Sequence, residues 1–232
     1  MTFILNIETS GEICSVSLSK NKEIIAYKES SEKNSHSTKL AILTDQILKE
    51  TSIKPSQLKA IAVSQGPGSY TGLRIGVAFA KGLCYANHIP LLAVDTLMIY
   101  GMQFLQNQSI DNDALICPMI DARRMEVYTA IYDSSLKPIM SVTSLILNEN
   151  SFESYKHQKI YFIGSGLEKW RTLAQSKYPN YYFVSNILPY ASAMASLSYT
   201  LYNNQHFVDV AYFEPFYLKE FMAGTSVKNK LI

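Results

Sequence analysis

The sequence is typical of a globular protein of moderate size. Of its 232 residues, 47% are hydrophobic. Its 21 lysines and arginines exceed its 19 aspartates and glutamates, which gives a net charge of +2. This composition excludes low-complexity disorder, collagen and coiled coil, and the charge falls short of the strongly basic balance of an autonomous nucleic-acid binder. No run of 18 apolar residues occurs, so we predict no membrane span.

The amino terminus and the cysteines both favour the cytoplasm. Residues 1–8 lack the basic start and the cleavage site of a signal peptide. The three cysteines, Cys14, Cys84 and Cys117, are an odd number without metal-ligand spacing, which is typical of reduced, buried thiols. We therefore expect a cytoplasmic protein.

The first part of the chain predicts a meander followed by a helix. Alternating apolar and polar residues predict three antiparallel strands, over residues 3–9, 12–19 and 23–28. In the second of these strands we expect the serines to face solvent: Ser15, Ser17 and Ser19. The period then becomes helical, with a cap at Ser35 or Ser37 and an apolar stripe formed by Leu40, Leu43 and Ile47.

Strands and helices then alternate. We expect a strand over 59–64, a glycine-rich turn, a helix over 71–87 and a strand over 90–94. That last strand is apolar throughout, as a parallel strand covered on both faces should be. Asp95 is placed to cap a further helix that runs to about residue 106.

The opening pattern then returns. Strands are expected over 114–120, 126–132, 138–143 and 159–163, with helices from residue 167 and over 191–203. In both copies an acidic residue, Glu8 or Asp121, ends the first strand. The repeat predicts an α/β, duplicated ribonuclease-H-like fold of the actin, Hsp70 and sugar-kinase superfamily, in which a cleft separates two subdomains. We place the N-terminal subdomain at 1–108 and a more degenerate C-terminal one at 109–232.

The segment richest in glycine lies between the predicted strand 59–64 and the predicted helix 71–87. Four glycines fall within residues 66–76. This segment fails the two nucleotide-binding templates, because Leu73 stands where a P-loop needs lysine and Thr71 stands where a dinucleotide turn needs glycine. Two interpretations remain: a tight turn packed between neighbouring elements, or a loop that contacts a phosphate or carboxylate. For the second, the candidate residues are Gly66, Gly68, Ser69, Thr71, Gly72 and Arg74.

Other polar residues offer weaker hypotheses. Glu8 and Asp121 are candidate cleft acids that would either hold magnesium through water, as in a small-molecule kinase or ATPase, or stabilise their hairpins. The four histidines lack zinc-ligand spacing, and His36-Ser37 is better explained as a helix start than as a nucleophile pair. We assign no catalytic residue and no metal. Arg123-Arg124 indicates either a solvated turn, which we favour, or a phosphate contact. Tyr181-Tyr182-Phe183 indicates either core or edge-strand packing, which we favour, or a surface that stacks bases.

Several segments together resemble one bacterial family. These segments are Ile4-Leu5-Asn6-Ile7-Glu8-Thr9-Ser10, His36-Ser37-Thr38-Lys39-Leu40, the loop 66–74, Ala93-Val94-Asp95-Thr96-Leu97 and Asp121-Ala122-Arg123-Arg124-Met125-Glu126-Val127-Tyr128. They resemble the TsaB family, also called YeaZ. Gly164-Ser165-Gly166 and Glu214-Pro215-Phe216-Tyr217-Leu218 fit its second half more loosely, so the resemblance covers essentially the whole chain.

The resemblance implies a role in the biosynthesis of N6-threonylcarbamoyladenosine in tRNA. TsaB proteins are degenerate relatives of TsaD and the Kae-type, glycoprotease-like proteins, which carry a metal-binding His-x-x-x-His in the helix that here begins at Thr96 and contains no histidine. The implied role is a noncatalytic scaffold that pairs with a TsaD-type catalytic subunit, with a TsaE-type ATPase as a further partner, tRNA reached indirectly and homodimers formed by the same surface. No cofactor is expected on this chain alone, and ATP or ADP is expected at the interface of the complex.

The helix over 71–87 carries small residues that would let another helix approach closely. Glycine inside a helix costs about 1 kcal/mol relative to alanine, so three of them need a packing reason. That reason is either a partner or the chain's own sheet. For a partner, we expect the interface to include Leu40, Leu43, Ile47, Gly72, Gly76 and Ala80.

Overall fold

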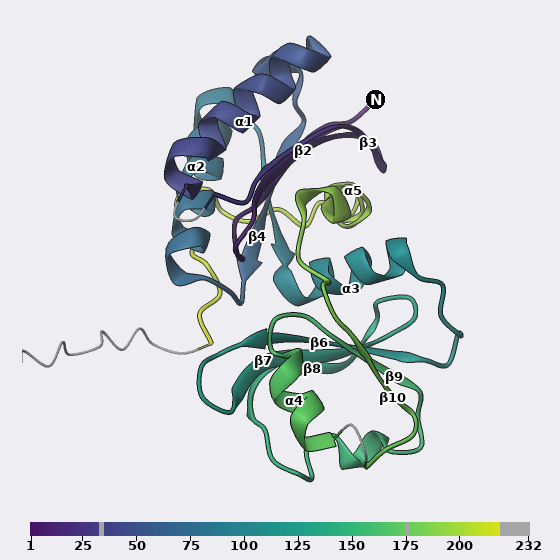
Figure 1. Cartoon of the computed structure of the whole chain (residues 1–232). Coiled ribbons are helices and arrows are strands. Elements are labelled where there is room, and N and C mark those ends of the chain that lie inside the picture. The colour runs from purple at the N-terminus through teal and green to yellow at the C-terminus, as the bar shows by residue number, and fades with distance from the viewer. Residues whose placement is uncertain (33–34, 175–176, 219–232) are drawn as a thin grey trace, which may run out of the picture.

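The structure, a computed structural model, describes residues 1–32, 35–174 and 177–218 and contains two five-stranded sheets (Figure 1). The strands of the first sheet are β1 (Phe3–Glu8), β2 (Cys14–Lys20), β3 (Glu23–Ser30), β4 (Ala60–Gly66) and β5 (Leu91–Asp95). Their order is β3-β2-β1-β4-β5. The first three strands pair antiparallel, and β4 and β5 then add in parallel.

The second sheet repeats this topology. Its strands are β6 (Leu115–Asp121), β7 (Glu126–Asp133), β8 (Pro138–Ile146), β9 (Ile160–Ile163) and β10 (Tyr181–Val184). Their order, β8-β7-β6-β9-β10, again places a three-stranded antiparallel meander beside two parallel strands. The duplicated ribonuclease-H-like α/β fold predicted from the sequence is therefore confirmed.

The helices follow the predicted order along the chain. They are α1 (His36–Thr51), α2 (Tyr70–Asn87), α3 (Thr96–Asn107), α4 (Leu167–Ala174) and α5 (Ala195–Asn203), with short 3₁₀ turns η1 (Pro55–Gln57), η2 (Glu153–Tyr155) and η3 (Ala191–Met194). Ser35 is the N-cap residue of α1. Asp95 caps α3 as predicted, because its carboxylate accepts the backbone N–H of Met98 at 3.0 Å.

Helices cover both faces of the first sheet (Figure 1). On one face, α1 and α2 pack on Leu5 and Ile7 of β1. On the other face, η3 and α5 pack on Ile4 together with the alanines of β4. Helix α3 lies between the two sheets, where Phe104 packs on Ile116 of β6. The chain thus returns to its first sheet after completing the second. The boundary at residue 108 stays a prediction.

The return of η3 overturns the prediction for the serines of β2. All three are fully buried, because η3 covers the side of the strand that was expected to face solvent. Ser17 Oγ donates to the carbonyl of Ala191 at 2.8 Å, and the N–H of Ala191 donates to Ser15 Oγ at 2.9 Å. The amide of Asn6 donates to the hydroxyls of Ser17 and Ser19. A buried hydroxyl needs such partners, and these come from far along the chain.

The second sheet has an aromatic core. Trp170 of α4 is fully buried and lies 5.9 Å, between ring centroids, from Phe162 of β9. Tyr181 and Phe183 pack on the same phenylalanine at 5.1 and 5.5 Å. The run Tyr181-Tyr182-Phe183 is therefore part of an edge strand, as its packing interpretation predicted.

Within the three described stretches, no helix combines the length and the apolar character that crossing a membrane would require. The tail 213–218, which the sequence suggested to be ordered, is described up to Leu218. The segment 225–232, which looked loose, lies outside the described residues.

We predict that Trp170→Ala lowers the free energy of unfolding by about 3–5 kcal/mol, because truncating a fully buried aromatic side chain leaves a cavity. Tyr182→Ala, at a side chain that is 41% exposed, should cost about 1 kcal/mol. Urea denaturation of both variants measures the difference. Equal losses would mean that Trp170 does not centre the core of the second sheet.

Candidate functional site

The glycine-rich turn between β4 and α2 packs against the turn that follows β1. A Cβ built on Gly68 would lie 2.6 Å from the carbonyl oxygen of Ser10, and one built on Gly72 would lie 2.0 Å from that of Thr9. Both distances are shorter than any van der Waals contact. The N–H of Ser69 also donates to the Ser10 carbonyl at 2.7 Å. The glycines are thus required so that two backbone segments can approach each other, which supports the packing interpretation.

The same packing uses hydrogen-bond donors that an anion would need. Ser69 donates its N–H to Ser10, and the N–H of Gly72 is capped by Ser69 Oγ at 3.2 Å. The structure does bring the six candidate residues of the loop together at the start of α2. Contact of this loop with a phosphate, carboxylate or nucleotide stays a prediction.

Glu8 ends β1, and its side chain is fully buried. Its Oε1 accepts the N–H of Ser10 at 2.5 Å, which closes the turn after the strand. Burial raises the pKa of this carboxyl from its ordinary value of 4.5 to about 7, and hydrogen bonding by Ser10 offsets only part of the effect. Glu8 therefore changes its charge near neutral pH.

Asp121 ends β6 at the equivalent position but is exposed. Its Oδ1 accepts the N–H of Arg123 at 2.6 Å and pairs with Lys169 Nζ at 2.7 Å. Lys169 also donates to the carbonyl of Glu126, so it ties both sides of the hairpin. Each strand-end acid thus accepts the N–H two residues further on. This geometry supports the interpretation that they stabilise their hairpins.

These acids do not fit a shared magnesium site of the kind that phosphotransferases of this fold use. Glu8 has no surface to offer to a hydrated ion, and Asp121 already pairs with a lysine. In residues 1–32, 35–174 and 177–218, no three side chains of His, Cys, Asp or Glu are grouped so that they could hold a metal ion.

Sequence reasoning missed the polar groups that join the two halves. Tyr100, on α3, is buried, and burial raises the pKa of its phenol. A hydrogen bond with the Ser165 side chain lowers this pKa, and the charge of Glu8 raises it. The Tyr132 hydroxyl, on β7, donates to Asp95 Oδ1 at 3.4 Å, and burial raises the pKa of Asp95 to about 6. In the sequence, only the cap position of Asp95 pointed to this group of residues. Its partner Tyr132 comes from the second sheet, so their contact depends on how the two sheets pack and could not be predicted from the sequence.

The partner surface predicted from the sequence has to be relocated. Its six residues are all buried within the chain: Leu40, Leu43, Ile47, Gly72, Gly76 and Ala80. The three aliphatic side chains of α1 pack into the core against the first sheet. Gly72 and Gly76 face the Thr9 turn. A partner can reach α2 only on its opposite face.

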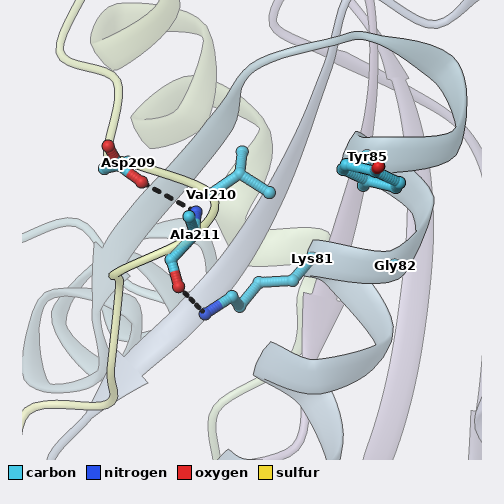
Figure 2. Close-up of a pocket in the computed structure, with 6 residues that line it drawn as sticks. All are labelled: Lys81, Gly82, Tyr85, Asp209, Val210 and Ala211. Carbon is cyan, nitrogen blue, oxygen red and sulfur yellow. Dashed lines mark hydrogen bonds between the residues drawn. The ribbon is translucent and has the colours of Figure 1, made fainter.

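That opposite face borders the segment 208–217, which runs back along α2. Lys81 Nζ donates to the carbonyls of Ala211 and Phe213, both at 3.0 Å, and so ties the segment to the helix. Figure 2 shows the first of these bonds and the side chains around it. We call residues 208–217 the strap.

Two hollows lie between α2 and the strap. The first, of about 500 Å³, is lined by Lys81, Gly82, Tyr85, Asp209, Val210 and Ala211 (Figure 2). The second, of about 420 Å³, is lined by Arg74, Val77, Ala78, Lys81, Glu214, Pro215 and Tyr217. Because Lys81 borders both, we treat them as one feature, the α2 groove.

Gly82 stands out on this face. Apart from its chain neighbours and the backbone of its own helix, no described atom lies within 4 Å of a Cβ built there, so packing against other elements does not explain the missing side chain. Its neighbour Tyr85 is 79% exposed. Glycine at this exposed helix position costs about 1 kcal/mol of stability relative to alanine. Such a glycine beside an exposed aromatic ring is typical of a surface that another element covers.

Comparisons with known proteins identify relatives of this chain. The family model described as TsaD, tRNA N6-adenosine threonylcarbamoyltransferase, matches residues 23–173. The tRNA threonylcarbamoyladenosine biosynthesis protein TsaB of Bacillus subtilis is 38% identical over 132 residues, which is 56% of this chain and 54% of that protein. The chain thus aligns with about half of that relative. The TsaB protein of Escherichia coli is 27% identical over 232 residues, 98% of this chain and 99% of that protein.

A solved structure shows the same fold. The Pseudomonas aeruginosa protein described as similar to peptidase YEAZ superimposes with a TM-score of 0.80 at 24% identity. The match covers 94% of this chain and all of that one. The duplicated architecture is therefore shared over nearly the whole chain.

We predict opposite effects for one substitution at two glycines of α2. Gly72→Ala should destabilise the chain by about 3 kcal/mol, because the new methyl group meets the backbone carbonyl of Thr9. Gly82→Ala should stabilise it by about 1 kcal/mol, because alanine favours the helix and the space is open. Chemical denaturation compares the two. Equal effects would contradict the orientation of α2.

We predict that Glu8→Gln changes how stability depends on pH. Between pH 4.5 and 7 the folded wild type binds more protons than the unfolded chain, so its stability falls as pH rises, and above pH 7 the full penalty is present. Glutamine stays neutral and can still accept the N–H of Ser10. The variant should match the wild type below pH 4.5 and exceed it by about 3 kcal/mol at pH 8. The same stability difference at both pH values would show that Glu8 does not titrate in this range.

Proposed function

Because this chain belongs to the TsaB family, also known as YeaZ, within the wider group that the TsaD family model describes, we propose that it serves in the biosynthesis of N6-threonylcarbamoyladenosine in tRNA. Its role is that of a noncatalytic scaffold or activating subunit. In that role it pairs with a TsaD-type catalytic subunit.

One observation carries the noncatalytic part of this proposal. The two acids at the strand ends, which catalytic relatives of this fold direct at a metal and phosphates, are each used inside the chain. Glu8 is buried and bound to the N–H of Ser10, while Asp121 is bound to Lys169. The alternative, a small-molecule kinase or ATPase, would require the Thr9–Ser10 turn to open, and that turn is packed on α2.

The α2 groove supports the pairing part. Ala78 and Gly82 lie four residues apart and are both exposed, so they form a shallow path on which a helix can come close to the backbone. Tyr85 stands one turn further on, and tyrosine is among the side chains most enriched in protein interfaces. We assign this face of α2 and the adjoining strap to the TsaD-type partner.

The remaining partners follow from the same role. A TsaE-type ATPase joins the complex, tRNA is contacted indirectly, and a homodimer uses the same face of α2 in competition with the heterodimer. ATP or ADP is bound at the interface of the complex rather than by this chain alone. The complex works in the cytoplasm, where tRNA is modified.

We predict that Gly82→Leu weakens pairing with the TsaD-type protein of the same organism at least tenfold, because an isobutyl group would stand in the path of the docking element. The fold should persist, since Gly82 is exposed and a Cβ built there meets no described atom outside its own helix. Analytical sedimentation of mixtures measures pairing. Ser141→Leu, at an exposed position of β8, places the same side chain far from α2 and is the matched control.

Three results bear on the proposal. Normal pairing by Gly82→Leu would contradict the assigned surface. Failure of the wild-type chain to pair would contradict the role itself. Modification of tRNA by the other purified components at the same rate with and without this chain would contradict an activating function.

A further inference from the structure

Arg74 is an exposed arginine that the structure nevertheless holds in a defined position. Its Nε–H donates to the hydroxyl of Tyr217 at 3.2 Å. Its guanidinium carbon lies 4.1 Å from the centre of the Tyr70 ring, and the two tyrosine rings are 5.0 Å apart. A free arginine side chain gives up considerable rotamer entropy when it binds, and here two tyrosines have already fixed it.

These contacts leave the outer end of the guanidinium available. Nε is engaged by Tyr217 and the guanidinium lies over the Tyr70 ring, so neither contact uses the two terminal amino groups. Among the described side chains, no carboxylate forms an ion pair with Arg74 within 4.0 Å. This includes the carboxylate of Glu214, which lines the same hollow. The fork therefore offers two parallel donors to an acceptor from outside the chain.

The surroundings of Arg74 indicate what that acceptor is attached to. The hollow beside it has a volume of about 420 Å³ and is partly walled by the aliphatic side chains of Val77, Ala78 and Pro215. An acceptor flanked by apolar groups fits such a hollow. A nucleic-acid backbone fits it less well, because the whole chain carries a net charge of only +2, short of the strongly basic surface that binds successive phosphates.

We propose that Arg74 anchors an aspartate or glutamate side chain of the TsaD-type partner, whose aliphatic neighbours fill the hollow between α2 and Pro215. This inference rests on the proposed pairing and names the chemistry that makes it specific. The carboxylate accepts both terminal amino groups of Arg74, while Tyr70 and Tyr217 exclude water from one side of the pair. Because the arginine is held before binding, little entropy is lost when the pair forms.

The position of Arg74 on α2 also defines the length of the contact. Arg74, Ala78, Gly82 and Tyr85 follow one another at spacings of four, four and three residues and share one face of the helix. At 1.5 Å per residue, the eleven steps from Arg74 to Tyr85 span about 16 Å. The docking element thus covers about three turns of α2, with its carboxylate near one end and its smallest side chain opposite Gly82.

Charge variants of Arg74 test the anchor. Arg74→Glu should weaken pairing about 100-fold, because a carboxylate would then face a carboxylate, and Arg74→Lys about tenfold, because lysine lacks the planar fork. Arg124→Glu makes the same charge change on the exposed β6–β7 turn and should leave pairing within twofold of the wild type. Titration calorimetry with the TsaD-type protein measures all three.

Removing the hydroxyl that holds Arg74 gives a second readout. Tyr217→Phe keeps the ring and should weaken pairing about threefold through lost positioning of the guanidinium. Tyr182→Phe, at a ring that is 41% exposed on the second sheet and outside the docking face, should have no effect. A charge swap completes the test: one acidic residue of the partner, changed to lysine, should restore pairing with Arg74→Glu.

The outcomes separate this inference from the proposed function. If Gly82→Leu abolishes pairing and Arg74→Glu pairs like the wild type, the anchor is wrong and the docking face stands. If neither variant weakens pairing, both are wrong. If Arg74→Glu pairs normally but the complex loses affinity for tRNA, the fork binds RNA phosphate and the carboxylate anchor is overturned.

Discussion

The orientation of α2 depends on one contact, in which its first turns lie directly on the backbone of the Thr9–Ser10 turn. Gly68 and Gly72 permit the approach, and a hydrogen bond from Ser69 to Ser10 fixes it. Because a helix is rigid, this contact at one end decides which residues point outward along its whole length. The outward set includes Arg74, Ala78, Gly82 and Tyr85, so the contact that positions the glycine-rich loop also sets the face of α2 that we propose for docking.

The duplication shows how two equivalent positions can come to differ. Glu8 and Asp121 both end the first strand of their sheet, and both accept an N–H two residues later. Glu8 is buried, which raises its pKa to about 7, whereas Asp121 lies at the surface and pairs with Lys169. Both carboxylates are thus engaged within their own turns, which supports the noncatalytic role that we propose.

Local patterns in the sequence predicted most of the fold. The change of period from two to 3.6, the cap at Asp95 and the repeated acid at a strand end are all encoded within a few residues, so they could be recognised without tertiary information. The burial of Ser15 and Ser17 could not, because the residue that covers them, Ala191, lies about 175 positions away. The sequence also could not show that Gly72 faces inward and Gly82 outward. Small residues occur on both faces of α2, and only the packed structure distinguishes them.

The most direct test of this account is hydroxyl-radical footprinting of the chain, alone and mixed with the TsaD-type protein. Tyr85 is 79% exposed on the outward face of α2, and Tyr182 is 41% exposed on the second sheet. Strong protection of Tyr85 in the mixture, with unchanged oxidation of Tyr182, is the result that the account predicts. A complex in which Tyr85 is oxidised as fast as in the free chain would contradict it.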